Sequence, residues 1–372
     1  MERIIRTMLQ IASLINSELE ILTSKTPPKL KSGISFWRNG ATGQLQIGSR
    51  FSNFLLPDQI GSLEIEPALR LLASGELAEG FETKNLLSIL EELSLLDQEE
   101  TEINYEYGEE ENRNIAASNN RSVAQDSFLT RIEIEADGIT RTPRVKDGGI
   151  RKVLERREFA IQIHGSGRIA FALLGTLFAT GFELCEITKD FEVRGRDVIG
   201  GCVTKKDIGR AARLKMAELL LESSLYPEPS QLLKRANLII SIGSPPAEVL
   251  QEWNRERIPQ LYIDFDNSGE IRIGPYIEPG FGACFNCVNI AENESGRPSI
   301  NALHGSHSND DFEVTAALAT FSAGIVSLEV ARIADTGKSD LLNKSTLYST
   351  LNYLEPQITA WERHPRCGCN WL

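Results

Sequence analysis

Two close cysteine pairs that lie far apart in the chain constrain the fold of this sequence more than any other feature. Cys284 and Cys287 form a Cys-x-x-Cys pair, and Cys367 and Cys369 lie one residue apart near the C-terminus. Zinc prefers four ligands such as cysteine thiolates, arranged as a tetrahedron. Two cysteines that lie close together in the sequence can supply two of these ligands from one turn of the chain. We therefore predict one structural zinc ion per chain, which ties the C-terminal segment to the loop before the first pair.

The thiols have other interpretations, a redox pair above all. A thioredoxin-like Cys-x-x-Cys would lie at the start of a helix early in its domain, which does not fit the first pair. Four protein ligands would leave the metal no open position for catalysis. Gly282 and Gly368 are expected to relieve crowding around the two pairs. Cys185 and Cys202 are expected to be ordinary buried residues.

Composition and charge argue against several classes of function. The chain has 39 basic and 52 acidic residues, a net charge of -13, which repels phosphate backbones unless a basic patch offsets it. The first 22 residues have the charge pattern of an amphipathic helix and not of a signal peptide, and "IAFALLGTLFATGF" is too short to span a bilayer. Six cysteines in 372 residues make no disulfide framework. We expect a cytoplasmic protein without nucleic-acid or membrane partners.

Residues 28–96 have the pattern of a small module. Two short β-type runs in "GISFWRNGATGQLQIG" predict a hairpin, and "RFSNFLLP" predicts a third strand that Pro57 stops. The segments "EIEPALRLLASG" and "ETKNLLSILEELSLL" predict helices, the first of which ends at Gly75. Strands followed by helices indicate a winged-helix-like recognition module, and with the preceding helix we place the first domain at residues 1–97.

Two charged stretches follow this module. Residues 97–111 hold eight acids, which predict an acidic linker or insertion over residues 98–140, with an acidic docking segment as the alternative. Residues 141–157 hold seven Lys or Arg. This basic stretch is expected to be the solvated face of a helix that leads into the next domain, with contact to an acidic partner as the alternative.

From residue 159 onward, strand and helix patterns alternate. That alternation predicts an α/β domain, Rossmann-like with a doubly wound parallel sheet, over residues 141–372. In "HGSGRIA", Gly165 would permit a tight turn, Gly167 would let a phosphate approach the helix N-terminus, and Ala170 would pack the helix on the sheet. The other interpretation is that the loop only makes the turn, and the motif alone favours neither.

Four segments together resemble a known family. "RREFAIQIHGSGRIA", "RGRDVIGGCVTKKDIGRAA", "IRIGPYIEPGFGACFNC" and "HPRCGC" are similar to the E1-like, ThiF-related proteins of azole and azoline peptide biosynthesis, above all to their stand-alone leader-peptide-binding partner proteins, the ocin-ThiF-like group. The resemblance covers about residues 28–96 and 141–372. It implies a winged-helix precursor-recognition module, a zinc-tied E1-like domain and a homodimer as a further expectation. It also implies a partner, a separate YcaO-type cyclodehydratase that uses ATP.

The sequence departs from the E1-like adenylating pattern at three places. The family's Asn-Leu-x-Arg-Gln is absent from "FEVRGRDVIGG", Ala212 stands where the pattern has Lys, and no Asp follows "NLIISIG". Without these groups a site cannot readily neutralise a triphosphate or hold Mg²⁺. Asp190 matches a ribose-binding acid by position. We therefore expect a degenerate nucleotide loop at Gly165, Gly167 and Asp190, no productive ATP binding and no catalytic residue.

Three functions from different classes remain open. The first is a non-catalytic scaffold that binds the leader of a ribosomally made precursor peptide, the second an active E1-like adenylating enzyme, and the third a DNA-binding regulator, which the net charge disfavours. A leader would add a strand to the first module. The expected peptide-binding residues are Phe51, Asn53 and Leu55 on the strand, Lys84 at the rim, and Leu86 and Leu90 on the helix. The alternative is that the leucines only fill the module's core.

Overall fold

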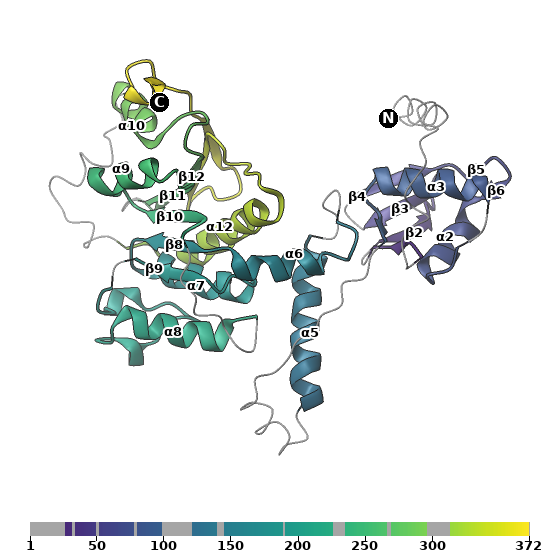
Figure 1. Ribbon diagram of the computed structural model, residues 1–372, viewed down its shortest axis with the longest axis horizontal. Helices are drawn as coiled ribbons and strands as arrows, with labels where there is room; N and C mark the ends of the chain where they lie inside the picture. The colour runs from purple at the N-terminus through teal and green to yellow at the C-terminus, as the bar shows by residue number, and fades with distance from the viewer. Residues whose placement is uncertain are drawn as a thin grey trace. The chain divides into compact units, whose positions relative to one another are not determined.

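Two units, Met1–Val153 and Leu154–Leu372, make up the computed structural model (Figure 1), and each is described by itself. The predicted division at residues 97 and 140 stays a prediction, and the helix predicted for the first 22 residues lies outside the described part of the chain. The structure describes residues 27–31, 34–49, 52–77, 80–98, 121–139, 145–188, 190–225, 235–265, 269–295 and 313–371.

Short antiparallel strands form the base of the first unit. A three-stranded sheet has the order β2 (Ser35–Arg38), β3 (Leu45–Ser49) and β4 (Ser52–Leu56). The predicted hairpin and third strand are confirmed, and β4 ends directly before Pro57, which cannot donate to a ladder. Two further pairs are formed by β1 (Lys29–Leu30) with β7 (Leu96–Asp97), and by β5 (Gln59–Ile60) with β6 (Leu63–Glu64).

Two amphipathic helices pack on this sheet. α2 (Ile65–Ala73) ends just before Gly75, whose φ of +79° makes it the predicted C-terminal stop. α3 (Phe81–Glu92) is shorter than the predicted helix, because Ser94 turns the chain at φ +56° and the next residues enter β7. The shared core contains Leu45, Ile47, Leu56, Ile65, Ala68, Leu69, Leu72, Leu86, Leu87, Leu90, Leu95 and Leu96.

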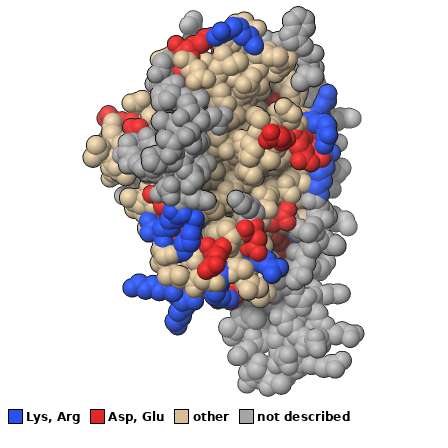
Figure 2. Space-filling view, turned by 90° about the vertical axis from the view of Figure 1, so that its left-hand side faces the viewer, with Lys and Arg blue, Asp and Glu red and all other residues tan. Residues whose placement is uncertain are grey.

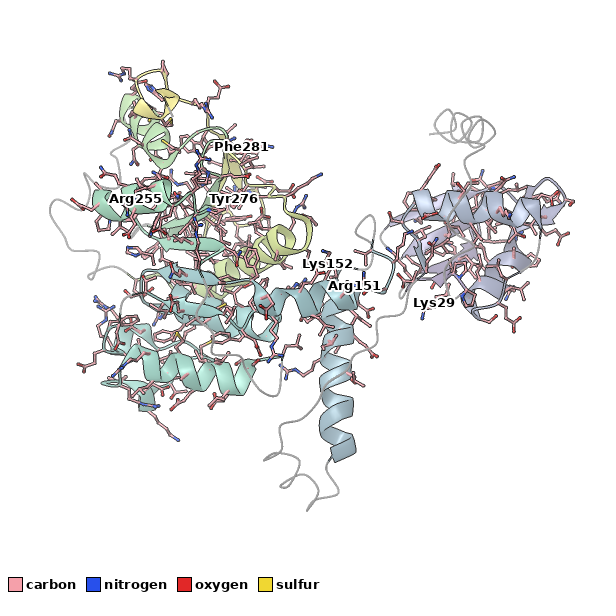
Figure 3. All side chains as sticks on the ribbon, in the orientation of Figure 1. Lys29, Arg151, Lys152, Arg255, Tyr276 and Phe281 are labelled. Carbon is pink, nitrogen blue, oxygen red and sulfur yellow. The ribbon has the colours of Figure 1, made fainter. Side chains whose placement is uncertain are left out.

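The segment expected to be a linker contains a helix. α5 (Arg121–Asp137) lies within residues 98–140, and Ile132 and Ala136 on it are buried, so this part of the stretch is a packed helix. The interpretation of the whole stretch as a linker or insertion stays a prediction. Leu129, Ile132 and Ala136 recur at three- and four-residue spacing, which is a helical signal, but the acidic run before them favoured the linker interpretation. α6 (Ile150–Glu155) carries Arg151 and Lys152 (Figure 3) and continues into the 3₁₀ turn Arg156–Glu158.

A seven-stranded sheet forms the centre of the second unit. Its order is β14-β13-β12-β11-β10-β8-β9, and the expected wholly parallel sheet is corrected to a mixed one. The parallel strands are β8 (Ile161–His164), β9 (Cys185–Ile187), β10 (Leu238–Ile242) and β11 (Gln260–Phe265). β12 (Glu270–Ile277), β13 (Lys344–Ser349) and β14 (Gln357–Ala360) are antiparallel. Only residues 266–269 join β11 to β12, too few for the crossover that a parallel neighbour needs.

Helices pack against this sheet (Figure 1). They are α7 (Arg168–Ala179), α8 (Ala212–Ser223), α9 (Ala247–Arg255), α10 (Phe285–Glu294) and α12 (Ala316–Thr336). Among the described residues, α12 alone is long and apolar enough to cross a membrane, but more than half of it is buried inside the fold. α12 packs beside α7, and apolar side chains of both helices belong to the same core.

The basic stretch supplies a buried ion pair that the sequence did not reveal. The Arg156 guanidinium donates to both carboxylate oxygens of Asp335 at 3.0 and 2.7 Å and to the Thr180 carbonyl at 3.0 Å. Both paired side chains are only 3% exposed. Arg157 pairs with the buried carboxylate of Glu183 at 2.6 Å, but its own side chain is 31% exposed. The expectation of a solvated face is therefore corrected for Arg156.

We predict that Asp335→Ala lowers the free energy of unfolding by about 3–5 kcal/mol, because it leaves the Arg156 charge buried without its carboxylate. Urea denaturation of the full chain measures this loss. Asp340→Ala is the matched control. It removes the acid of an exposed ion pair with Arg332, which lies on α12 as Asp335 does. Equal losses for the two variants would contradict the prediction.

Candidate functional site

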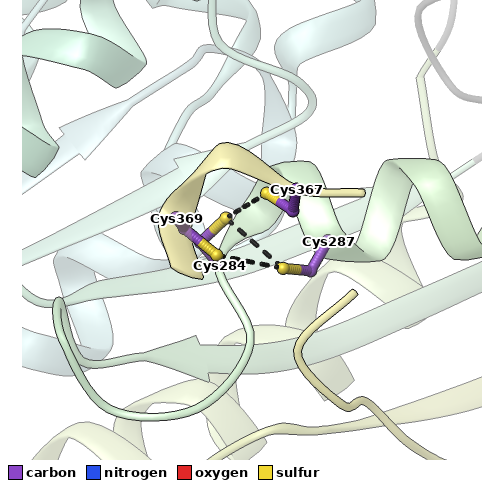
Figure 4. Close-up of side chains that lie close together, drawn as sticks. All are labelled: Cys284, Cys287, Cys367 and Cys369. Carbon is purple, nitrogen blue, oxygen red and sulfur yellow. Dashed lines mark hydrogen bonds between the residues drawn. The ribbon is translucent and has the colours of Figure 1, made fainter. Parts of the chain in front are cut away.

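The four cysteines of the two pairs meet in one cluster. Their sulfur atoms all lie within 4.8 Å of one another (Figure 4). The Sγ–Sγ distances are 3.7 Å for Cys284–Cys287, 3.5 Å for Cys284–Cys367 and 3.4 Å for Cys287–Cys369. A tetrahedral zinc ion with bonds of about 2.3 Å needs sulfurs about 3.8 Å apart. The cluster can therefore hold a metal ion such as zinc.

A sharp turn before α10 presents the first pair. Cys284 is the N-cap of α10 and Cys287 lies in its first turn. Gly282 before them has φ +76°, and a Cβ there would lie 2.0 Å from the Asn343 side chain, so glycine is required. The expectation for Gly368 is corrected, since a Cβ at that position would meet no atom within 4 Å.

Hydrogen bonds also hold the C-terminal segment to this turn. Arg363 donates to the carbonyls of Gly282 and Gly280 at 2.8 and 2.6 Å. The Trp361 ring N–H donates to Ser345 on β13 at 3.0 Å. The ring of His364 lies 3.1 Å from a Glu294 oxygen, outside the sulfur cluster. The cluster therefore lies where a tail, a turn and a helix meet.

Hydrogen bonds and burial shift the thiol pKa values of Cys284, Cys367 and Cys369 by different amounts. Burial raises the pKa of Cys284 far above its ordinary value and that of Cys369 to about 11. Burial also acts to raise the pKa of Cys367, but hydrogen bonds from the Cys369 backbone and the Asn286 amide outweigh it and lower the pKa to about 7. Because the thiolate is the metal ligand, a divalent cation at the centre would favour the charged form of all four.

A buried charged network supports the helix of this site. Arg272 on β12 donates to Glu292 of α10 and, at 3.1 Å, to Asp264 of β11. Its guanidinium also lies 5.8 Å from the centre of the Trp361 ring. These groups join α10, the sheet and the C-terminal segment, and the sequence contained no local signal for them. Tyr276 lies on the same strand as Arg272, and Phe281 lies in the turn that follows this strand (Figure 3).

The glycine loop lies between β8 and α7, as predicted. Gly165 has φ +141°, and a Cβ there would lie 2.6 Å from Cβ of Ile242 at the end of β10. Gly167 is the N-cap of α7 with φ +88°, and its neighbour in space is the Glu313 carboxylate. Ala170 is fully buried, in agreement with its expected packing role. Both glycines therefore permit close contacts with the protein's own atoms.

Charged groups beside this loop are paired within the chain. Asp190 follows β9, and its carboxylate accepts from the backbone N–H of Arg213 and pairs with the Arg213 side chain, each at 3.2 Å. Lys215, one helical turn after Ala212, is nearly buried, 3.7 Å from Asp207 and 3.5 Å from Glu218. The first residues after β10 are Gly243 and Ser244, so no carboxylate stands there.

The predicted peptide-binding residues divide into two groups. Asn53 and Leu55 are exposed on β4, on the face away from the core, and Lys84 is exposed on α3. Leu86 and Leu90 are fully buried among the core leucines, which leaves them no surface for a peptide, so their groove role is corrected. Phe51 lies outside the described residues.

Charge on the surface is mixed. On the face shown in Figure 2, Lys and Arg lie in small groups beside Asp and Glu and form no single basic surface. Arg235, Arg255 and Arg257 line a hollow at the end of α9 together with Glu256, whose carbonyl accepts a bond from Arg235. The described residues on the face in Figure 2 therefore form no continuous basic surface of the kind that phosphate backbones require.

The architecture is an α/β fold in which a mixed sheet carries helices on its faces. No protein-family profile and no curated protein matches this sequence. The chain is similar in structure to Escherichia coli MccB crystallised with ATP, with a TM-score of 0.62, 12% identity and coverage of 92% of this chain and 99% of that one.

Two further solved structures agree with this. The microcin C7 biosynthetic enzyme MccB in complex with N-formylated MccA has a TM-score of 0.61, 12% identity and coverage of 92% and 99%. PaaA has a TM-score of 0.61, 15% identity and coverage of 89% and 100%. At these identities the similarity establishes the fold.

We predict about one zinc ion per chain in protein purified without chelators. Cys367→Ser together with Cys369→Ser should lose the metal and loosen the C-terminal segment, because metal binding at such a site contributes folding free energy. Metal analysis and limited proteolysis measure the two effects.

Cys202→Ser is the matched control, because Cys202 is a half-buried thiol outside the cluster and its removal should leave the metal content unchanged. Metal-free protein, or a disulfide between Cys284 and Cys287 in protein from a reducing cytosol, would overturn the assignment.

Proposed function

We propose that this chain is a non-catalytic recognition scaffold that binds the leader of a ribosomally made precursor peptide and presents it to a separate YcaO-type, ATP-dependent cyclodehydratase for azoline or thiazole formation. The proposal places the protein in the cytoplasm, with a structural zinc ion at the four cysteines and with a homodimer as a further partner state. The observation that carries it is the fold shared with MccB over nearly the whole chain.

The known complexes of MccB support a peptide as the ligand. MccB has been crystallised with N-formylated MccA, and N-formylation describes the amino end of a polypeptide. The resemblance of four segments of the sequence to leader-binding partner proteins points to the same class of ligand. Both arguments concern relatives of low identity, so the binding site must be argued from this chain's own residues.

The free edge of β4 is the part of the first unit that fits an extended peptide. Within the described residues β4 has β3 on one side and no strand on the other. Ser49 and Ser52 are partners across a connection of two residues. In a hairpin with so short a connection, the two flanking residues form a hydrogen-bonded pair. Because bonded and non-bonded pairs alternate, the backbone groups of Asn53 and Leu55 then point to the free edge.

The side chains beside this edge set its chemistry. Asn53 and Leu55 project from the outer face of the sheet, opposite Leu45, Ile47 and Leu56 in the core. Leu55 is 38% exposed and offers an apolar contact. Lys84 on α3 would pair with an acid of the leader. In this revised site the leucines of α3 belong to the core of the module and do not contact the peptide.

We predict that residues 26–97 bind the leader and that Asn53→Pro weakens binding at least tenfold without unfolding the protein, because it removes one backbone donor from the edge. Fluorescence polarisation with a labelled leader measures the affinity. Asn53→Ala is the matched control: it keeps the backbone N–H and should bind within about threefold of wild type.

The alternative site lies in the second unit. Full affinity retained after deletion of residues 1–97 would place leader binding there and refute the assignment to β4. Equal weakening by Asn53→Ala and Asn53→Pro would show that the side chain, and not the backbone, makes the contact.

The alternative function is that of an E1-like adenylating enzyme. The MccB structure with ATP is the reason to consider it. Ala212 in place of a Lys and the missing acid after β10 argue against it. We predict no phosphate or pyrophosphate release from ATP by this chain, with or without peptide. Release at enzyme-like rates that is lost in Gly167→Ala would establish the alternative.

A further inference from the structure

The N-terminus of α7 lies where a doubly wound sheet most often binds a ligand. The parallel strands have the order β9, β8, β10, β11, so the winding reverses between β8 and β10. Ligands of such sheets bind beyond the carboxyl ends of the strands at this switch point. The first N–H groups of a helix have no partner within it and carry partial positive charge, so an anion is favoured there.

A carboxylate of the protein itself occupies this position. Glu313 Oε2 accepts a hydrogen bond from the backbone N–H of Arg168, the first residue of α7, at 3.2 Å. A Cβ built on Gly167 would lie 2.2 Å from the same oxygen. The carboxylate therefore lies directly against the glycine backbone, as a phosphate oxygen does in a glycine loop.

The residues next to Glu313 are held at the same place. Oε1 of Glu313 accepts from the Val314 N–H at 3.0 Å. The Arg168 guanidinium donates to the Val314 carbonyl at 2.9 Å and to the Val198 carbonyl at 3.0 Å. Thr315 caps α12 directly afterwards, so these bonds join the start of α12 to the start of α7.

Burial is the largest influence on this carboxylate. It raises the pKa of Glu313 above its ordinary value, and the N–H bonds from Val314 and Arg168, which lower the pKa, offset only part of the rise. An ionised carboxylate is costly to bury unless it is hydrogen-bonded. The helix N-terminus supplies both the donor and the favourable dipole.

We propose that Glu313 is the built-in anion of this glycine loop, a carboxylate latch that closes the position where a phosphate group would bind and fixes the start of α12 to the start of α7. The inference goes beyond the proposed scaffold function and does not rest on leader binding. It explains why a glycine is needed at position 167, because a Cβ there would collide with the Glu313 carboxylate. A phosphate-bearing ligand can enter the loop only when Glu313 leaves it.

The test is anion-dependent stability of the full-length protein. Glu313→Ala should lower the Tm by about 3–10 °C in chloride buffer, since it removes charge-assisted hydrogen bonds to α7 and Val314. Inorganic pyrophosphate, at the same ionic strength, should then raise the Tm of this variant by several degrees more than that of wild type, because the probe refills the vacated position.

Two variants complete the experiment. Glu248→Ala removes an exposed acid from the first turn of α9 and reports the general effect of the anion on stability, so it should respond as wild type does. Glu313→Gln keeps an acceptor oxygen without the charge, so it should show a smaller loss of Tm and a pyrophosphate response between those of wild type and Glu313→Ala. If Glu313→Ala does not fold, the pyrophosphate response of Glu313→Gln is compared with that of wild type instead.

Two results would overturn the latch. One is a pyrophosphate response of wild type as large as that of Glu313→Ala, which would mean that the loop is open. The other is no response in any Glu313 variant beyond that of Glu248→Ala, which would mean that the loop is not an anion position. Neither result bears on leader binding, which the Asn53 variants test separately.

Discussion

The hydrogen bonds at the first turn of α7 join most of the second unit. From one guanidinium, Arg168 donates to the carbonyls of Val198 and Val314, and its own N–H donates to Glu313. Buried polar groups must be bonded, so the loop after β9 and the start of α12 have to approach this turn. The tight contact of Gly165 with Ile242 adds the end of β10. These contacts fix the start of α7, and the apolar core that α7 shares with α12 and the sheet continues the packing.

The cysteine cluster is a second tie, of a different chemical kind. The C-terminal segment buries few large apolar side chains, and Trp361, the largest with described burial, is only half-buried. Such a segment gains little from the hydrophobic effect, so directed bonds must hold it. Arg363 supplies bonds to backbone carbonyls, and the four thiols supply a site whose metal affinity would add directly to folding free energy.

The two units differ in what they leave available for binding. In the second unit, the expected nucleotide-loop groups are engaged within the chain: Asp190 with Arg213, and the start of α7 with Glu313. In the first unit, the backbone edge of β4 has no strand beside it among the described residues. This difference is what a recognition scaffold requires, since an edge strand binds a peptide through main-chain bonds without catalytic groups.

The sequence alone determined features that are local or that follow from ligand chemistry. The hairpin, the turn between β8 and α7, and the meeting of the two cysteine pairs were predictable, because each depends on short-range geometry or on four thiols that satisfy one ion. Only the tertiary structure decided the antiparallel half of the sheet, the burial of Leu86 and Leu90, and the place of Glu313 at Gly167. Glu313 is separated from its partner Arg168 by 145 positions, and no local pattern distinguishes it from other acids. Its role arises because folding brings an unpaired helix end and a carboxylate to the same point, and burial makes each require the other.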